Sequence, residues 1–600
     1  MKILGISDGM TGGAALIENG RILYAIHEER LIRAKMATGF PQASISHVLE
    51  ATETTVDEID GIAIATLNEV FREEPLAYDG WLRKEQEPLK EIMLGASSVV
   101  SQVFGSSPPL KKAYYGLKFL TGKSRRKVLE AKLREDWGFT CKVEFIEHHF
   151  AHASCAYFTS GLAKATVVTL DGAGDNTSSR VYRVTKGRFE QLQTVDSFNS
   201  IGNYYAYVTH LCGFKAQKHE GKITGLAALG QPIYADLLRH FVAFDKGHVV
   251  NRGGVFYWSA VKALQKALPD DFKKEDLAAS MQHVLETEGG AYIQHWVERS
   301  GYGDVAVAGG VFANVKFNQA VHELDNVDSL FVHPGMGDEG LAVGAALAYS
   351  ATHSSPQSHQ LAYQLKDVYL GPSYSDVEIE QAIQQARENK AEIAENLPFE
   401  RCENIERRIA ELLAEGYVVA RFDGRMEYGP RALGDRTILY QPTDSTVNHW
   451  LNQRLSRTEF MPFAPVTLED YADQCYKNLD GARHTAQFMT ITFNCTDWMK
   501  QHCPAVVHVD GTARPQLISK SVNPSYYQIL KEYHALTGLP CLINTSFNLH
   551  GEPIVCTPKD AVNSFLQGGL DYLAAGPYLL KHPQIDSFQR PAAKAIATVS

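Results

Sequence analysis

The sequence lacks any long hydrophobic run. Nowhere do about 18 apolar residues follow one another, as a membrane-spanning helix requires. The apolar stretch at the N-terminus, in MKILGISDGM, is too short for a signal peptide. We therefore expect a soluble, unprocessed protein with no membrane partner.

Paired cysteines and a positive net charge are also missing. The nine cysteines lie far apart between Cys141 and Cys556 and include no Cys-x-x-Cys pair, which argues against a disulfide framework and against a thiolate zinc site. Such cysteine usage is typical of the reducing cytoplasm. The net charge of −11 disfavours nucleic acid as a partner, because a phosphate backbone binds to a concentrated basic surface.

A repeated hairpin pattern lies in the first half of the chain. KILGISD predicts a strand that ends in an acid, and the turn residues Asn19 and Gly20 separate two further strands, GAALI and RILYAI. The pattern recurs in KATVVTLDGAG and in the strands on either side of Lys186 and Gly187. It predicts two related halves that face each other across a cleft, as in actin and the sugar kinases. Unrelated hairpins in a β-rich chain are the alternative.

Two strand-to-helix junctions rich in glycine follow. One contains Gly309 and Gly310, and the other is the segment HPGMGDEG. Glycines at such junctions let a nucleotide approach backbone amides and the positive end of a helix. We therefore predict nucleotide binding there, with tight turns that bind no ligand as the alternative.

Two segments interrupt or end this pattern. The stretch of about residues 70–136 contains the basic run TGKSRRK and the helical piece RRKVLEAKLREDW, and we interpret it as an insertion that shapes an acceptor site or as a solvated charged helix. The polar stretch ATHSSPQSHQ predicts a linker near residues 352–361. The helices SDVEIEQAIQQARENK and NIERRIAELLAEG and the strand YVVARFDG are expected beyond it.

Three polar motifs in this second module suit an anion. They are GRMEYGPRALGDRTI, HVDGTARPQ and NTSFNLHGEPIV. Arginine offers a planar fork of donors and glycine exposes backbone N–H groups, so the motifs predict a site for phosphate or carboxylate. Structural salt bridges are the alternative for each arginine. The candidates are Arg425, Arg431, Arg436, Arg457 and Arg514.

The segment EHHFAHASCAYF carries a histidine pair. If a helix begins at about His148, then His148 and His152 project from one face and can reach one metal ion, while His149 points elsewhere. Two satisfied core or surface histidines are the alternative. Zinc proteases place Glu directly after the first His, whereas this chain has His149 there, so we do not expect a metalloprotease.

Two acids can complete the ligand set. Asp171 ends a predicted strand and Asp338 lies in a glycine-rich loop. Together with the histidines they make two nitrogen and two oxygen ligands, which suit Fe(II), Mn(II), Zn(II) or Mg(II). We expect Fe(II) among these cations.

The motifs together resemble the NodU/TobZ family of O-carbamoyltransferases over nearly the whole chain. The resemblance rests on HEERLIRAKMATGFP, EHHFAHASCAYF, TLDGAGD, GKITGLAALG, GGVFANVKFN, GMGDEG, GRMEYGPRALGDR and NTSFNLHGEPIV, in this order. It implies an α/β protein with two domains. The first, at residues 1–355, would have the duplicated actin-like fold of the tRNA threonylcarbamoylation enzymes, and the second, at residues 362–600, would be YrdC-like.

The same resemblance implies a function and the residues that perform it. The second domain would make carbamoyl adenylate from ATP and carbamoyl phosphate, and the first would transfer the carbamoyl group to a hydroxyl of a small molecule, a natural product or a sugar. The catalytic residues, the first four of them metal ligands, would be His148, His152, Asp171, Asp338 and His149. The residues that contact the nucleotide or the donor would be Gly309, Gly310, Asn314, Lys222, Arg431, Arg436, Arg457, His508, Arg514, Ser546 and Asn548.

The expected chemistry needs each of these parts. An alcohol is a poor nucleophile at neutral pH, so the acyl group needs an activated leaving group and its tetrahedral oxyanion needs stabilisation. Adenylation supplies the first, and a metal that polarises the carbamoyl oxygen supplies the second. Because water would destroy the intermediate, we expect an enclosed channel between the domains.

The sequence departs from the family pattern in its first loop. Met10 stands where the family carries a His, so His149, Glu28 or the acceptor itself would have to act as the base. In NQRLSRTEF, Arg457 is only a provisional phosphate contact. Transfer of threonylcarbamoyl to tRNA and a nucleotide-sensing module without enzyme activity are the alternative functions. The acceptor and the oligomeric state are open, with a homodimer as our expectation.

Overall fold

The computed structural model describes residues 1–69, 71–82, 123–354, 362–388, 397–456 and 462–588. The chain forms two compact units. The first contains Met1–Glu28 and Met36–Leu365, and the second contains Glu29–Lys35 and Lys366–Ser600. The second unit therefore includes a short segment from near the N-terminus, which the domain limits predicted from the sequence did not include.

The first sheet of the first unit has the order β3-β2-β1-β5-β7. Its strands are β1 (Lys2–Ser7), β2 (Gly13–Glu18), β3 (Arg21–His27), β5 (Gly61–Ala65) and β7 (Lys142–Ile146). The three strands β1 to β3 form an antiparallel meander, and β5 and β7 continue the sheet parallel to β1.

The second sheet repeats this topology, in the order β10-β9-β8-β13-β14. Its strands are β8 (Lys164–Gly174), β9 (Thr177–Thr185), β10 (Arg188–Asp196), β13 (Asp304–Ala308) and β14 (Ser329–Val332). Again three antiparallel strands are followed by two that run parallel to the first. The duplicated, actin-like arrangement predicted from the hairpin repeat is confirmed.

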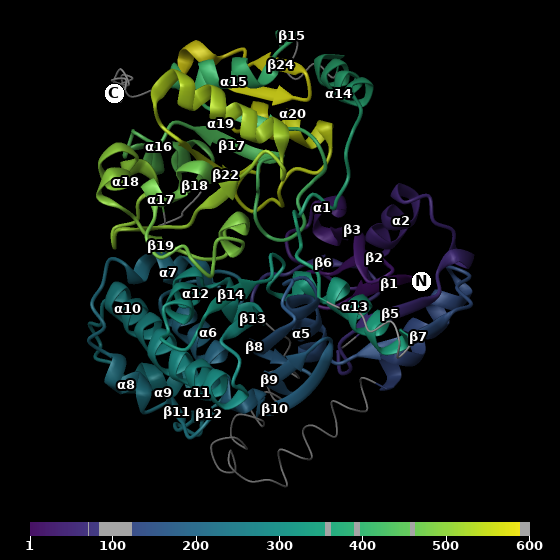
Figure 1. Ribbon diagram of the computed structural model, residues 1–600, viewed down its shortest axis with the longest axis vertical. Helices are drawn as coiled ribbons and strands as arrows, with labels where there is room; N and C mark the ends of the chain where they lie inside the picture. The colour runs from purple at the N-terminus through teal and green to yellow at the C-terminus, as the bar shows by residue number, and fades with distance from the viewer. Residues whose placement is uncertain (70, 83–122, 355–361, 389–396, 457–461, 589–600) are drawn as a thin grey trace. The chain divides into compact units, whose positions relative to one another are not determined.

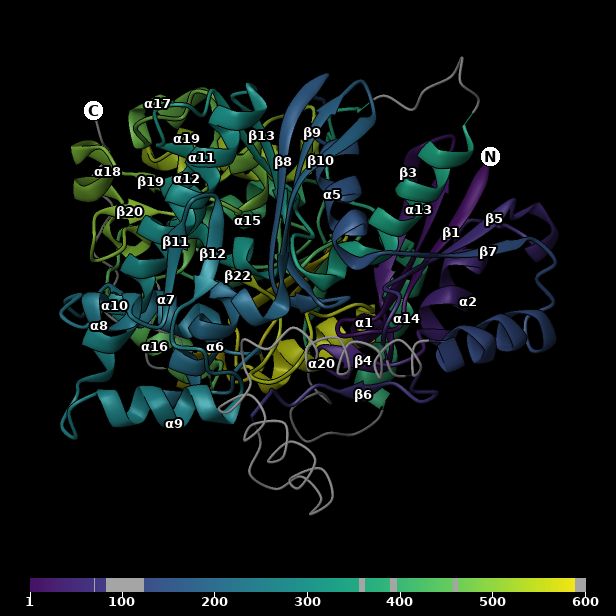
Figure 2. The ribbon, with the colours of Figure 1, turned by 90° about the horizontal axis from the view of Figure 1, so that it is seen from below.

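Two helices lie between these sheets (Figure 2). Helix α5 (His148–Phe158) packs on β8 and β13, and α13 (Leu341–His353) packs on β1 and β5. The two helices also pack on each other, and Gly344 permits the close approach, because a Cβ there would lie 2.0 Å from the carbonyl oxygen of Ala151. The ends of both helices thereby meet the ends of the sheet strands.

The remaining elements of the first unit flank the sheets (Figure 1). A helix over 123–135 confirms the helical piece predicted in the insertion, whose residues 83–122 lie outside the described part. The others are α2 (Gln42–Ala51), α6 (Ile201–Leu211), α7 (Glu220–Ala227), α8 (Ala235–Arg239), α9 (Trp258–Ala267), α10 (Lys274–Val284), α11 (Gly290–Ser300), α12 (Val315–His322), β4 (Ala37–Thr38), β6 (Leu76–Ala77), β11 (Val242–Asp245) and β12 (His248–Asn251).

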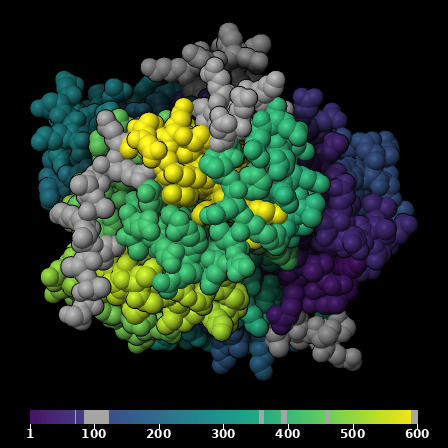
Figure 3. Space-filling model, turned by 90° about the horizontal axis from the view of Figure 1, so that it is seen from above, coloured from purple at the N-terminus to yellow at the C-terminus, as the bar shows by residue number. Residues whose placement is uncertain are grey.

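The second unit is built on one mixed sheet of eight strands, in the order β15-β24-β23-β16-β17-β22-β18-β21. Its described residues from Lys366 on are coloured green to yellow in Figure 3. The strands are β15 (Phe399–Arg401), β16 (Val419–Phe422), β17 (Arg436–Tyr440), β18 (Ala464–Leu468), β21 (Gln516–Ile518), β22 (Cys541–Ser546), β23 (Tyr572–Ala575) and β24 (Tyr578–Lys581).

Helices cover this sheet, and a small hairpin of β19 (Phe493–Asn494) and β20 (Thr512–Ala513) accompanies it. The two helices and the strand that the sequence predicted at the start of this module are confirmed as α14, α15 and β16. The helices of the unit are α1 (Glu28–Ile32, from its second residue), α14 (Asp376–Glu388), α15 (Ile405–Ala414), α16 (Val447–Arg454), α17 (Ala472–Cys475), α18 (Asp497–His502), α19 (Pro524–Thr537) and α20 (Pro558–Gln567). That this module is YrdC-like stays a prediction.

Two further observations concern the whole described part of the chain. All nine cysteines are free, and seven of them are buried. Among the described residues, no helix is long and apolar enough to cross a membrane.

Candidate metal centre

Helix α5 begins where the sequence predicted. Glu147 caps it, because its carboxylate accepts a hydrogen bond from the amide of Phe150 at 2.8 Å. From this start, His148 and His152 lie one turn apart on one face, with ring centroids 4.6 Å apart. Both side chains are buried.

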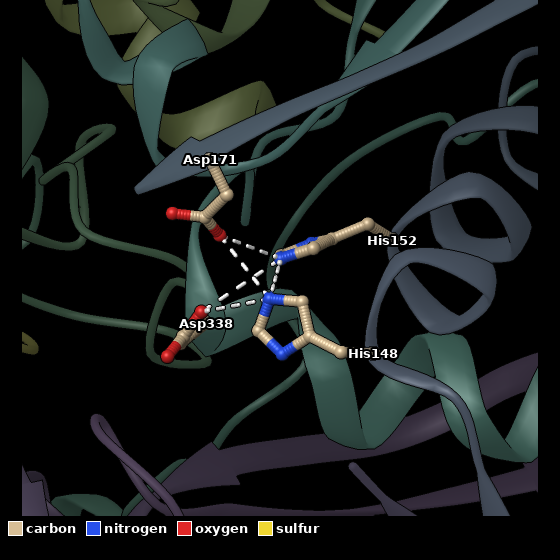
Figure 4. Close-up of side chains that lie close together, drawn as sticks. All are labelled: His148, His152, Asp171 and Asp338. Carbon is tan, nitrogen blue, oxygen red and sulfur yellow. Dashed lines mark hydrogen bonds and ion pairs between the residues drawn. The ribbon is translucent and has the colours of Figure 1, made fainter. Parts of the chain in front are cut away.

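The four predicted ligands come together at the N-terminal end of α5 (Figure 4). The Nε2 atoms of His148 and His152 are 3.1 Å apart, and each is 3.2 Å from Oδ2 of Asp171 at the end of β8. Asp338, in the loop before α13, places Oδ1 at 3.8 Å and 3.7 Å from the same two nitrogens. Residues nearly 200 positions apart in the chain thus meet at one point.

These distances fit a metal ion. A tetrahedral cation with bonds of about 2.1 Å has ligand atoms about 3.4 Å apart, and the four atoms lie within 4.8 Å of one another. Two neutral imidazoles and two carboxylates also balance the charge of a divalent cation.

The electrostatics of the cluster favour positive charge at its centre. Burial lowers the pKa of His152, but hydrogen bonds with Asp171 and Asp338 outweigh burial and raise that pKa well above its ordinary value. Burial conversely raises the pKa of Asp171, and the two histidines bring it well below its ordinary value. Without a cation the cluster therefore holds protons, which a metal would replace on binding.

Glycines leave room for the cluster. A Cβ at Gly174 would lie 2.1 Å from the ring of His148, and one at Gly310 would lie 3.1 Å from Oδ1 of Asp171. The amide of Gly172 donates to that same Oδ1 at 2.6 Å. The TLDGAGD motif therefore has glycine at position 174, because the ring of His148 packs against that residue.

Asp175, the last acid of this motif, holds the start of α5. Its carboxylate accepts hydrogen bonds from the amides of His148 at 2.8 Å, Leu67 at 2.8 Å and Asn68 at 2.7 Å. The same turn thus supplies one candidate ligand and fixes the backbone of another. The sequence analysis missed Asp175, although its place four residues after Asp171 was a usable signal.

His149 lies outside the cluster. Its Nδ1 bonds with the hydroxyl of Thr169 at 2.8 Å and its Nε2 with the carbonyl oxygen of Thr177 at 3.0 Å. Burial and the two neighbouring imidazoles lower its pKa well below the ordinary value, so the ring is neutral. Both ring nitrogens thus bond to groups of the protein, and the prediction that His149 is catalytic stays a prediction.

Two acids near the first loop, Glu28 and Asp8, also form hydrogen bonds within the protein. Glu28 accepts from the amide and the hydroxyl of Ser44 at 2.7 Å and 2.6 Å, so it caps α2. Asp8, at the end of β1, pairs with Arg125, whose Nε donates to it at 3.0 Å in a fully buried contact. The proposed replacement of the family His by Glu28 is therefore not supported.

The glycine-rich junction after β13 is closely packed. Gly309 has a φ of +114°, and a Cβ there would lie 2.2 Å from the carbonyl oxygen of Leu170, so only glycine fits. Asn314 caps α12 by accepting from the amide of Phe317 at 3.0 Å, and its Nδ2 donates to Gln282 at 2.7 Å. Nucleotide binding at this junction, and by the buried Lys222 on α7, stays a prediction.

The three polar motifs of the second unit meet at one place. Nε2 of Gln516 donates to the carbonyl oxygen of Leu433 at 2.7 Å, and Nδ2 of Asn544 donates to Gln516 at 2.8 Å and to the carbonyl oxygen of Ala432 at 3.2 Å. These residues belong to HVDGTARPQ, NTSFNLHGEPIV and the GPRALG loop. Sequence reasoning chose the arginines and missed the two amides that join the motifs.

Arg436 has a structural environment. It is fully buried, its two Nη atoms donate to main-chain carbonyl oxygens, including that of Asp435 at 2.9 Å, and its guanidinium lies 3.8 Å from the ring centroid of Phe422. These contacts stabilise the loop, and the prediction that Arg436 contacts phosphate stays a prediction. Arg457 lies outside the described residues.

The remaining candidates of the second unit stay predictions. Asn548 is buried and its Nδ2 donates to the carbonyl oxygens of Leu549 and Glu552 at 2.8 Å and 3.0 Å. His508 is buried beside Thr512. Arg431, Arg514 and Ser546 are half-buried.

Comparisons with known proteins agree with this division. The family model described as the carbamoyltransferase N-terminus matches residues 2–347, and that described as the carbamoyltransferase C-terminus matches residues 410–582. The chain is 31% identical to the nodulation protein NolNO of Sinorhizobium fredii, over 95% of this chain and 78% of that protein. It is also 31% identical to an uncharacterized protein of Methanocaldococcus jannaschii, over 96% and 99%, and 27% identical to the nodulation protein U of Rhizobium tropici, over 92% and 91%.

Proposed function

Because the chain belongs to the carbamoyltransferase family, and is therefore an enzyme that transfers carbamoyl groups, we propose that it is an ATP-dependent O-carbamoyltransferase with a metal centre. The observation that carries the proposal is the convergence of His148, His152, Asp171 and Asp338. The substrates proposed are ATP, carbamoyl phosphate and a small molecule with a hydroxyl group.

The first step belongs to the second unit. Water releases carbamate and phosphate from carbamoyl phosphate, a carbamate oxygen then bonds to the α-phosphorus of ATP, and pyrophosphate leaves. Gln516 and Asn544 join the three motifs that contain the arginines and glycines, which supports this step. The arginines predicted to contact phosphate remain the candidates: Arg431, Arg436, Arg457 and Arg514.

The second step belongs to the first unit. The acceptor hydroxyl oxygen bonds to the carbamoyl carbon, the bond from that carbon to the adenylate oxygen breaks, and AMP leaves while the hydroxyl proton is released. A divalent cation held by the four ligands would polarise the carbamoyl oxygen as a Lewis acid. Residues of the chain orient the candidate ligand His148: Asp175 accepts a hydrogen bond from its backbone amide, and Gly174 leaves room for its ring.

A stepwise assay tests the proposal. The purified protein with ATP and carbamoyl phosphate should release pyrophosphate, whereas a nucleotide sensor would release none. His148→Ala and His152→Ala should keep this release but lose transfer and bound metal by at least tenfold. His240→Ala, an exposed histidine of the same unit, is the control and should change neither. Full transfer by the double variant His148→Ala/His152→Ala would sink the metal-centre proposal.

A further inference from the structure

A buried hydrogen-bond acceptor without a partner lies beside the candidate metal centre. Asn203, on α6, is 3% exposed, and its Oδ1 forms no hydrogen bond with any described residue. Buried polar atoms of this kind are uncommon, because a buried acceptor without a hydrogen bond loses its hydration without compensation. Asn203 Oδ1 is therefore a candidate acceptor for a hydrogen bond from a bound molecule.

The orientation of this amide is fixed. Nδ2 of Asn203 donates to the carbonyl oxygen of Ser197 at 3.3 Å, and turning the amide over would place two oxygens against each other. The backbone amide of Asn203 donates to the hydroxyl of Ser200 at 3.1 Å, which holds the start of α6. Oδ1 is therefore the atom that faces away from the helix.

The free oxygen faces Gly172, the residue after the candidate ligand Asp171. A Cβ placed on Gly172 would lie 3.2 Å from Oδ1 of Asn203 and 3.6 Å from Nε2 of Gln217. Oε1 of Gln217 accepts from the hydroxyl of Tyr78 at 2.8 Å, which leaves Nε2 as its end toward the glycine. No described residue accepts a hydrogen bond from this Nε2. One acceptor and one donor thus lie next to Gly172, which carries no side chain.

This pair complements a primary amide. A carbamoyl group carries two N–H donors on its nitrogen and an oxygen with two lone pairs, all in one plane. During transfer the bonds that change are those of the carbamoyl carbon to oxygen, and the N–H bonds stay intact. An acceptor on the nitrogen can therefore hold the group from the adenylate to the product.

We propose that Asn203 recognises the amino group of the carbamoyl being transferred and that Gln217 donates to its oxygen, an inference that rests on the proposed function. In this arrangement the second lone pair of that oxygen remains for the metal. Asn203 makes the site selective, because an acetyl group of the same shape would place a methyl group against an unpaired oxygen.

Two adenosine analogues test the assignment on the full-length protein. Adenosine 5′-sulfamate carries NH₂ where adenosine 5′-methanesulfonate carries CH₃, and both keep the oxygens. By calorimetry we expect the wild type to bind the sulfamate about tenfold more tightly at one site, as one buried hydrogen bond allows. Asn203→Ala should reduce this preference to below twofold.

Gln217→Leu separates the two roles. Because both analogues keep the sulfonyl oxygens, this variant should weaken both by a similar factor and leave the preference unchanged. Asn318→Ala is the matched control, since Asn318 is buried in the same unit and its Nδ2 also donates to a main-chain carbonyl, that of Phe312. It should leave both affinities unchanged.

Two results would overturn the inference alone: an unchanged preference in Asn203→Ala, or an equal loss of preference in the control. The proposed function fails separately. If the wild type neither releases pyrophosphate from ATP with carbamoyl phosphate nor binds either analogue, the adenylate route is wrong, and the assignment of Asn203 falls with it. Thermal melting of each variant shows whether a loss reflects unfolding.

Discussion

The absence of a Cβ atom at Gly174 allows the ring of His148 to reach the other three candidate ligands. An added Cβ would lie 2.1 Å from the imidazole, and the ring, unlike a flexible chain end, would have to rotate away from Asp171. We expect Gly174→Ala to lower the metal bound per chain at least tenfold, as measured by elemental analysis. Gly290→Ala, where the new Cβ would meet only Leu324 at 4.0 Å, should bind metal like the wild type. Equal metal content in the two variants would contradict the assignment of His148.

Glu220, on α7, gives a pH dependence of stability. Burial raises its pKa from 4.5 to about 7, and hydrogen bonds from backbone amides, including that of Gln217, only partly offset this. The folded protein therefore binds more protons than the unfolded chain between these values, so stability falls as pH rises from 4.5 to 7.

Glu220→Gln removes this effect. The free energy of unfolding of this variant should be close to that of the wild type at pH 4.5. It should exceed that of the wild type by about 3 kcal/mol at pH 8, since one pKa unit corresponds to about 1.4 kcal/mol. Urea unfolding at the two pH values measures it. A difference between variant and wild type that does not change with pH would show that the carboxyl group ionises normally.

At the scale of elements, Asp175 connects a turn, a loop and a helix. Asp175→Asn keeps an oxygen for Leu67 and Asn68 but places an NH₂ group against the amide of His148. We expect a three- to thirtyfold loss of metal affinity, measured by competition with a chelator, and a loss of about 1–2 kcal/mol in stability.

The control for this variant is Asp196→Asn, which also removes a carboxylate that caps a backbone amide, that of Phe198 at 3.0 Å. It should cost stability but leave metal affinity unchanged. If both variants lost metal equally, Asp175 would have no special part in placing α5.

The sequence predicted these elements where the signal was local. The strands β1 to β3 and β8 to β10 follow from alternating residues and from turn pairs such as Asn19-Gly20, and the start of α5 follows from the His spacing. The contacts of Asp175 and Asn203 were not predicted, because they join segments far apart in sequence and use ordinary polar residues. The four residues predicted as ligands do lie together, and they could be chosen because a metal centre requires few residue types; that they bind a metal stays a prediction.

For arginines the local signal could not separate a structural role from phosphate binding. Arg436 lies in a motif rich in glycine and cations, yet its guanidinium is used by carbonyl oxygens and by the ring of Phe422. A cation that stabilises a loop and a cation that binds phosphate look alike in sequence, because both lie among glycines. Only the contacts separate them, and Gln516 and Asn544 show where the motifs meet.

At the scale of the molecule, the segment Glu29–Lys35 belongs to the second unit although both of its neighbours belong to the first. Arg33 holds it: Nη1 donates to the carbonyl oxygen of Ile554 at 2.7 Å and Nη2 to that of Pro553 at 2.9 Å. The chain therefore passes between the units three times.

Arg33→Ala should loosen this attachment. Hydrogen bonds from a charged group contribute about 1.5–3 kcal/mol, so amide exchange around Ile554 and in α20 should become at least tenfold faster. Exchange in α5 should not change. Lys186→Ala, at an exposed turn position of the first unit, should leave all of these rates as they are. Unaltered exchange around Ile554 in the Arg33 variant would show that the segment is not held by this residue.

The assignment of Glu29–Lys35 also limits how such proteins can be recombined. A chimaera made by cutting once near residue 365 would give the second unit of one parent a foreign peptide from the other, opposite Ile554 and Gly429. Chimaeras that take residues 29–35 and the C-terminal region from the same parent would keep the native contacts within the second unit. The design of chimaeric carbamoyltransferases should therefore exchange two gene segments together, not one.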